Sequence, residues 1–227
     1  PALRSIGNAM GRGGLMYENK WMDITGMVSY ITCWNCAATV SVTERINGES
    51  ETLDHTAQYG MGNLGFNMDG NFHWEGFNLH LMCTVQDPKY KNYDNTFVFS
   101  DGSTKTISYN GKYATGISRV ELEIDPSYTY KDWRFWLSAR YFSRQYASRT
   151  NLAYFNGRWE TFGGVDWKVI PGLKLSLNVV NWLFQTGPKG SIDSVDTISD
   201  PAELQGILMS GKYMRPFEVN LSVSYKF

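Results

Sequence analysis

Alternating segments joined by very short turns constrain the fold of this chain most strongly. Side chains alternate between the two faces of a strand, so a correct antiparallel register must place like residues opposite each other. A two-residue turn at Lys131-Asp132 passes this test. One face then pairs only apolar or aromatic residues: Tyr130 with Trp133, Tyr128 with Phe135, Pro126 with Leu137, Ile124 with Ala139 and Leu122 with Tyr141. The other face is mostly polar, so the sequence predicts antiparallel hairpins with two distinct faces.

Two further tight turns give the same result. A turn at Glu75-Gly76 places Trp74, Phe72, Met68 and Phe66 opposite Phe77, Leu79, Cys83 and Val85. A three-residue turn, with Gly172 in the left-handed conformation, places Val169, Trp167 and Val165 opposite Leu173, Leu175 and Leu177. We expect about nine strands, near residues 13–19, 22–33, 60–74, 77–90, 114–130, 133–147, 159–170, 173–186 and 214–227.

The last strand and the long connections indicate a membrane barrel. Apolar residues occupy every second position from Phe217 to Phe227. Chain ends are usually disordered unless they are tied down, so we expect this strand to be paired on both sides in a closed barrel. Aromatic residues flank the tight turns, whereas the connections at 87–113, 148–158 and 187–213 are long and polar, the first with a hairpin signal at 100–103. Short periplasmic turns, long extracellular loops and interfacial aromatic rings are typical of an antiparallel transmembrane β-barrel.

Composition excludes several other classes of protein. The chain has 227 residues, 42% of them hydrophobic, and a net charge of -1, which gives no electrostatic reason to bind nucleic acid. No apolar run is long enough for a transmembrane helix, and no signal peptide is recognisable. Because the sequence begins with Pro1, we expect a piece cut from a longer chain. A soluble β-sandwich or lipocalin-like barrel also alternates, but its aromatic residues would not gather beside the tight turns.

Several stretches resemble the barrel of TonB-dependent outer-membrane receptors. The segment 178–184 (NVVNWLF), a polar loop and the closing 217–227 (FEVNLSVSYKF) are similar to the last two strands of that family. Residues 16–18 leading into 21–24 and 28–30 are similar to an earlier hairpin of the family. Trp182 departs from the family pattern and leaves the register of the upper part of its strand open. The resemblance covers the chain from about Gly13 onward and consists of diffuse patterns.

The resemblance implies a function and a set of partners. It implies TonB-energised uptake of a scarce, bulky nutrient (siderophore, haem, vitamin or glycan) across the outer membrane of a Gram-negative bacterium. The chain would be the C-terminal part of the barrel, and the plug domain and the TonB-contacting peptide would precede it. Other implied partners are outer-membrane lipid, the barrel-assembly machinery, which would read Tyr225 and Phe227 as an assembly signal, and a surface lipoprotein. The alternatives are a passive or structural barrel, or a barrel enzyme such as a lipase or protease.

Residues that carry chemistry are few, and we assign no catalytic residue, cofactor or metal. Cys33-Trp34-Asn35-Cys36 is predicted at a strand-to-loop junction, where a loop thiol pair or a local disulfide is favoured over redox catalysis. Cys83 is expected on the lipid face. The histidines His73 and His80 are expected in the lumen without metal-ligand spacing. The loop residue His55, near Ser50 and Asp54, is poor evidence for a catalytic triad.

The remaining candidate sites are on the lumen wall and in the loops. Glu123 is expected opposite Arg140, with Glu121 and Asp125 at diagonal positions, forming a charge ladder. The alternative is that Arg140 binds a plug or an anionic ligand. The loop aromatic residues could stack on sugars or rings, or pack loop against loop: Tyr90, Tyr93, Tyr109, Tyr113, Tyr154 and Phe155. Asp200, Pro201 and Glu203 predict a short helix over about 201–208.

Overall fold

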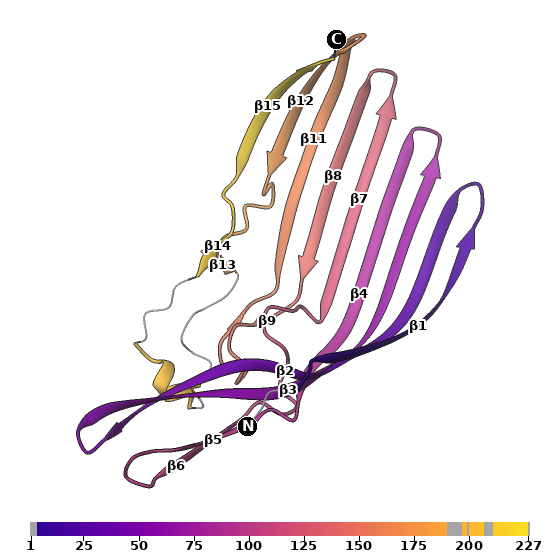
Figure 1. Ribbon diagram of the computed structural model, residues 1–227. Helices are drawn as coiled ribbons and strands as arrows, with labels where there is room; N and C mark the ends of the chain where they lie inside the picture. The colour runs from indigo at the N-terminus through magenta and orange to yellow at the C-terminus, as the bar shows by residue number, and fades with distance from the viewer. Residues whose placement is uncertain (1–3, 190–196, 199, 207–210, 227) are drawn as a thin grey trace.

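One large sheet dominates the computed structural model, which describes residues 4–189, 197–198, 200–206 and 211–226. Within these residues nine strands form a single antiparallel sheet (Figure 1). Their spatial order follows the chain: β1 (Gly7–Glu18), β2 (Met22–Ile46), β3 (Glu49–Trp74), β4 (Phe77–Lys91), β7 (Val120–Tyr130), β8 (Trp133–Phe142), β11 (Arg158–Ile170), β12 (Leu173–Val180) and β15 (Glu218–Tyr225). The predicted all-β antiparallel architecture is confirmed.

The registers follow from the turns. In the β7–β8 hairpin, Tyr130 pairs with Trp133 and Glu123 with Arg140, as predicted. The β3–β4 hairpin is also confirmed, with Trp74 opposite Phe77. In the β11–β12 hairpin, Trp167 pairs with Leu175 as expected, but Ile170 rather than Val169 pairs with Leu173, and a bulge between Lys168 and Ile170 absorbs the extra residue. Gly172 adopts the predicted left-handed conformation, with φ of 86°.

Three small elements lie in the long connections. The hairpin signal at 100–103 joins β5 (Asp94–Val98) to β6 (Thr104–Ser108), as predicted. Two short pairs, β9 (Gln145–Tyr146) with β10 (Tyr154–Phe155) and β13 (Pro188–Lys189) with β14 (Lys212–Tyr213), form separate ladders. β12 ends at Val180 because Asn181 is left-handed, and Trp182 turns out of the strand to donate its indole N–H to the Phe162 carbonyl.

The predicted helix is present as a shorter, tighter element. A 3-10 helix, η1 (Pro201–Leu204), begins at Asp200, whose side chain accepts a hydrogen bond from the amide of Ala202 at 2.9 Å. The N-cap and the proline at the start are therefore confirmed. Residues 207–208 of the expected helix lie outside the described residues. Across the described ranges, no helix has the length and apolar character needed to cross a membrane.

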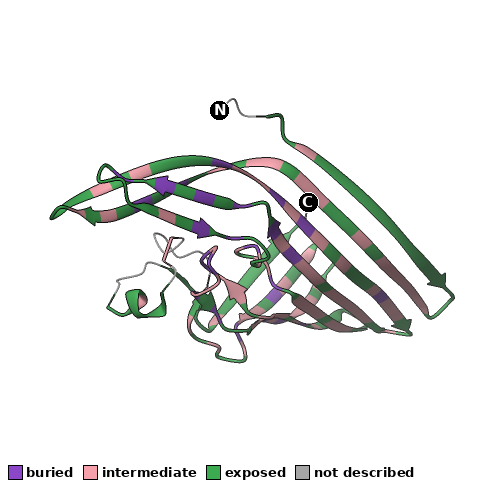
Figure 2. Ribbon diagram, turned by 90° about the horizontal axis from the view of Figure 1, so that it is seen from below, coloured by how far each residue is buried: buried purple, intermediate pink, exposed green. Residues whose placement is uncertain are grey.

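The sheet has an apolar face and a polar face. Leu64, Phe66, Phe135, Leu137 and Leu221 lie on the apolar face and are all exposed in the chain alone. Buried residues occur instead mainly at the long-loop end, where β2 and β3 continue far beyond the rest of the sheet (Figure 2). The sheet itself therefore has no core on its apolar side.

We call the buried part at the long-loop end the lobe; it consists of residues 36–60 and 93–109. It contains the far ends of β2 and β3 and the β5–β6 hairpin, which lie side by side in Figures 1 and 2. The Ser100 hydroxyl donates to Glu51 at 2.7 Å, and Lys105 forms an ion pair with Glu44. The lobe and the residues next to it bury one apolar cluster: Val40, Val42, Ala57, Tyr90, Tyr93, Phe97, Phe99, Ile107, Tyr109 and Ala114. The expectation that β2 ends near residue 33 and β3 begins near residue 60 is wrong.

Candidate functional site

Charged side chains gather on the polar face of β3, β4, β7 and β8. The registers place His80 opposite both Asn71 of β3 and Asp125 of β7, and Glu123 opposite Arg140. Alternation turns these side chains to the same side of the sheet. We call the group Asp69, His80, Glu123, Asp125 and Arg140 the polar network.

His80 bridges two carboxylates in this network. Its Nε2 lies 3.1 Å from Oδ2 of Asp69, and its Nδ1 lies 3.3 Å from Oδ2 of Asp125. An imidazolium donates to both carboxylates, whereas a neutral ring donates to only one of them. The other oxygen of Asp125, Oδ1, is buried and has no hydrogen-bond partner. The bridge therefore links three strands through one side chain.

Arg140 contacts the other carboxylate of the network. Its Nη2 lies 2.9 Å from Oε1 of Glu123, which is the directly cross-strand contact that the sequence predicted. Asp125 lies beside Glu123 but contacts His80 rather than Arg140. In the described part of the chain Glu121 forms no ion pair or hydrogen bond with Arg140, so the expected ladder of three carboxylates around one guanidinium is reduced to the Glu123–Arg140 pair.

Part of the network offers metal-ligand atoms. One ligand atom from each of His80, Glu123 and Asp125 lies within 4.8 Å of the other two. These residue types suit a small divalent cation. However, the guanidinium of Arg140 already contacts the Glu123 carboxylate, and His80 already joins Asp125 to Asp69. As arranged, the group is an ion-pair network.

A second polar node lies further round the sheet. Asp166 of β11 accepts a hydrogen bond from the Ser176 hydroxyl at 2.5 Å and lies 3.8 Å from charged nitrogens of both Arg134 and Lys174. Glu160, at the long-loop end of the same strand, contacts Arg158 and Lys189. The polar face is thus a wall of paired charges, not a smooth aliphatic surface.

Comparison with known proteins identifies the architecture. No protein-family model and no curated protein matches the sequence. Among solved structures, the ferric yersiniabactin uptake receptor FyuA from Yersinia pestis matches with a TM-score of 0.71 and 9% identity, over 98% of this chain and 30% of that one. The ferripyoverdine receptor of the outer membrane of Pseudomonas aeruginosa matches with a TM-score of 0.62 and 13% identity, over 100% and 28%. The copper transporter OprC matches with a TM-score of 0.67 and 12% identity, over 100% and 32%.

The fold is that of part of an outer-membrane receptor barrel. The resemblance to TonB-dependent receptors is therefore confirmed at the level of the fold. The chain spans about three tenths of the length of the solved receptors that it matches. In a barrel of this kind the apolar face of the sheet contacts lipid and the polar face lines the lumen. The polar network lies on the polar face of the sheet, the face that lines the lumen in barrels of this kind.

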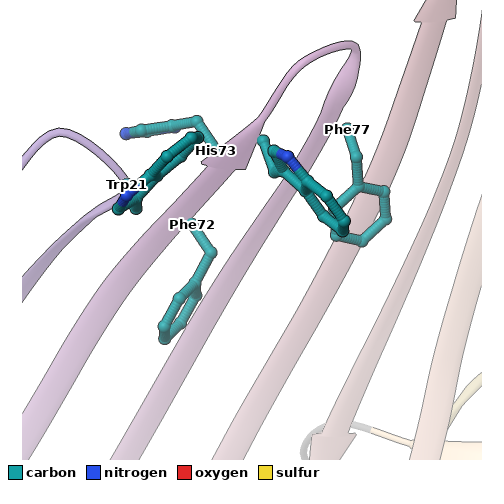
Figure 3. A pocket seen from close by; sticks show the side chains of 5 residues that line it. Trp21, Phe72, His73 and Phe77 are labelled. Atoms are coloured by element: carbon teal, nitrogen blue, oxygen red, sulfur yellow. The ribbon is translucent and has the colours of Figure 1, made fainter.

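Aromatic residues mark the tight-turn end of the barrel wall. Trp21, Phe72, His73, Trp74 and Phe77 line an apolar hollow of about 560 Å³ beside the β3–β4 turn (Figure 3). Aromatic rings are enriched at the interfaces of membrane barrels, where they meet headgroups. Tyr225 also lies at this end and is 54% exposed, opposite Leu173. Phe227, the other half of the expected assembly signal, lies outside the described residues.

Most loop aromatic residues are packed inside rather than offered to a ligand. Tyr93 and Tyr109 are fully buried, and Tyr90 and Phe155 are 7% and 4% exposed. Tyr93 stacks on Tyr59 with 4.3 Å between ring centroids. The expectation that these four residues contact a ligand is corrected here. Their rings are buried, and the loops would have to open before a ligand could reach them. The alternative in which they pack loop against loop describes this structure.

Tyr113 and Tyr154 remain the accessible members of that set. Tyr113 stacks on Tyr146 at 5.7 Å, and the guanidinium of Arg119 lies 4.6 Å from its ring centroid. Tyr154 is 45% exposed, and the Arg144 guanidinium lies 4.1 Å from its ring. Both rings therefore already have cationic neighbours at the loop surface.

The residues considered for an enzyme do not converge. His55, Ser50 and Asp54 lie in strand β3 rather than in a loop. Ser50 and Asp54 share one face of that strand, and His55 points to the other, against Phe97 at 6.0 Å. Cys33 and Cys36 also lie within a strand, β2, and not at a strand-to-loop junction.

A double-mutant cycle tests the central ion pair of the network. The side chains of Arg140 and Glu123 are 47% and 16% exposed, so we expect a coupling of only about 0.5 to 1 kcal/mol between Arg140→Gln and Glu123→Gln. Urea unfolding of the full-length protein in detergent measures it. Pairing Arg140→Gln with Asp166→Asn gives a control with no direct contact, and equal couplings in the two cycles would show that the Arg140–Glu123 contact contributes nothing.

Proposed function

We propose that the chain is the C-terminal part of the barrel of an outer-membrane transport receptor that takes up a scarce, bulky nutrient with energy supplied through TonB. The observation that carries this proposal is the match along the whole chain to receptor barrels. The matched proteins are a ferric yersiniabactin uptake receptor, a ferripyoverdine receptor and a copper transporter. A ferric siderophore or a copper species is accordingly the substrate class that we favour over haem, a vitamin or a glycan.

The edges of the sheet support a larger barrel. In the described residues β1 and β15 each pair on one side only. Unpaired backbone groups at a sheet edge cannot be left in lipid, so both edges need partners from the same protein. Nine strands are also an odd number, whereas bacterial single-chain barrels have an even number. We therefore propose that the remaining strands and a plug domain belong to the full-length protein.

The polar network supports a filled lumen. Paired charges such as Glu123–Arg140 and the His80 bridge offer donors and acceptors to a plug, and the lobe lies at the long-loop end. The proposed partners are the plug domain and TonB, outer-membrane lipid on the apolar face, the barrel-assembly machinery, and a surface lipoprotein at the loops. The proposed location is the outer membrane of a Gram-negative bacterium, and we propose no enzymatic activity.

An uptake assay tests the proposal. Cells lacking the full-length gene, and cells carrying it on a plasmid, are grown under iron or copper limitation and given radiolabelled ferric siderophores or copper. We expect roughly tenfold or greater loss of accumulation without the gene for at least one probe, and the same loss in complemented cells treated with a protonophore. Accumulation that needs the gene but resists the protonophore would instead identify a passive barrel. Accumulation of every probe without the gene would contradict a receptor for metal complexes.

A further inference from the structure

The two neighbouring cysteines lie at a bulge in strand β2. Cys33 pairs with Met61 and Cys36 pairs with Tyr59, so Trp34 and Asn35 together oppose the single residue Gly60. Asn35 has a φ of 56°, a left-handed conformation that asparagine adopts more readily than most residues. β1 pairs with β2 only as far as Trp34, and β4 pairs with β3 only from Gly60 onward, so the bulge lies where β2 and β3 leave the neighbouring strands and continue into the lobe.

The bulge brings the two thiols together. In a regular strand, residues three apart point to opposite faces. Here Met61 and Tyr59 are two apart on β3 and share a face, so their partners Cys33 and Cys36 share that face too. The two Sγ atoms are 2.8 Å apart, although Cys33 and Cys36 are free thiols in the structure. A disulfide bond needs a separation of about 2.05 Å, so the two sulfur atoms are already close to bonding distance.

The surroundings favour a disulfide over a metal. A zinc site needs four ligands, and a catalytic one needs three from the protein. Among the described residues, the only cluster of three or more His, Cys, Asp or Glu side chains with metal-ligand spacing is the one around His80, far along the sheet from Cys33. Burial, together with the neighbouring Cys33, raises the pKa of Cys36 to about 11. Thiolate, the form that binds metals, is therefore disfavoured at this position, whereas a disulfide carries no charge.

We propose that Cys33 and Cys36 form a disulfide that fixes the bulge between the barrel wall and the lobe. It forms by exchange with an oxidising disulfide of a thiol oxidase in the periplasm: the two thiols lose two protons and two electrons, one S–S bond forms between them, and the oxidase disulfide is reduced to a dithiol. The inference rests on the proposed location, because that compartment is oxidising.

The bulge has a structural consequence that such a bond would protect. Before it, odd-numbered residues of β2, such as Asp23 and Cys33, lie on the polar face. After it, even-numbered residues take that side, so Val40 and Val42 enter the lobe core at 2% and 1% exposure. A shift of the β2–β3 register by one residue would turn both valines out of the core. The disulfide therefore maintains the register on which the lobe depends.

Peptide mass spectrometry tests the bond. The full-length protein is isolated from outer membranes, its free thiols are blocked with iodoacetamide at the moment of lysis, and it is digested with trypsin. Residues 21–45 form one tryptic peptide that holds Cys33 and Cys36 but not Cys83. We expect this peptide to be unalkylated and two hydrogen masses lighter than the dithiol, and to accept two alkyl groups after reduction. Recovery of the doubly alkylated peptide without reduction would overturn the proposal. Since this readout is independent of uptake, it can fail while the proposed function stands.

Hydrogen exchange tests the role of the bond. We expect the double variant Cys33→Ser, Cys36→Ser to exchange amide hydrogens of residues 37–58 roughly tenfold faster than the unmodified protein, while amides of β8 and β11 are unchanged. Reduction of the unmodified protein should have the same effect. Cys83→Ser, on the apolar face of β4, is the matched control and should leave the lobe unchanged. Equal exchange in the double variant and the control would refute the fixing role.

Discussion

Replacement of Leu221 by arginine is expected to destabilise the barrel by about 2 to 4 kcal/mol. Leu221 lies near the middle of β15, pairs with Leu177, and is 74% exposed on the apolar face of the isolated chain. In a membrane the side chain at position 221 contacts lipid tails, and the guanidinium of an arginine placed there loses its hydration. The free energy of unfolding of the full-length protein, measured by urea titration in lipid vesicles, checks the expected loss.

The neighbouring position provides the control. Ser222 pairs with Ser176 on the polar face, so an arginine there points into the lumen. We expect Ser222→Arg to cost far less than Leu221→Arg, although both variants add the same side chain to the same strand. Equal stability of the two variants, or equal amounts of both in outer membranes at the level of the unmodified protein, would contradict the assignment of the apolar face to lipid.

Tight turns explain why most of the sheet could be predicted. A two-residue turn fixes the sum of paired positions, so the register of β7 and β8 follows from Lys131-Asp132 alone. The Glu123–Arg140 pair follows in the same way. The His80 bridge could not be found like this, because residues 92–119 separate β4 from β7 and leave their register undetermined by local pattern. Asp125 lies beside His80 because β4 and β7 pair across that long connection, and no tight turn fixes their register.

The lobe was missed for a different physical reason. Asn47-Gly48 is a strong signal for a two-residue hairpin turn, and both residues have positive φ, at 52° and 91°. However, the bulge at Asn35 moves the even-numbered apolar residues of β2 from the apolar face of the sheet to its polar side, and alternation within one strand does not reveal such a change of side. For the aromatic residues of 90–109, both ligand contact and packing of loop against loop therefore stayed open, because nothing predicted the extended β2–β3 hairpin that buries them. Recognition of Asn47-Gly48 would have supplied that hairpin.

Replacement of Phe97 by alanine is expected to cost the lobe about 3 to 5 kcal/mol of local stability. Phe97 is 3% exposed, lies against His55, and comes from the hairpin that closes the cluster over β2 and β3. Its removal leaves a cavity that the two hairpins can fill only by losing register. Native-state hydrogen exchange should therefore show residues 36–60 and 93–109 opening together, with β8, β11 and β12 unaffected.

Val98, the next residue in β5, provides a matched control. It is 63% exposed and points away from the cluster, so Val98→Ala should change exchange in the lobe by less than about 0.5 kcal/mol. The two residues differ in which side of one short strand they occupy, not in their distance from the barrel. If Phe97→Ala and Val98→Ala opened the lobe equally, the two hairpins would not share a core, and the aromatic residues at 90–109 would again be available to a ligand. If only Phe97→Ala opens it, the lobe is a packed unit, and a nutrient must be recognised by its outer surface or by residues that face the lumen.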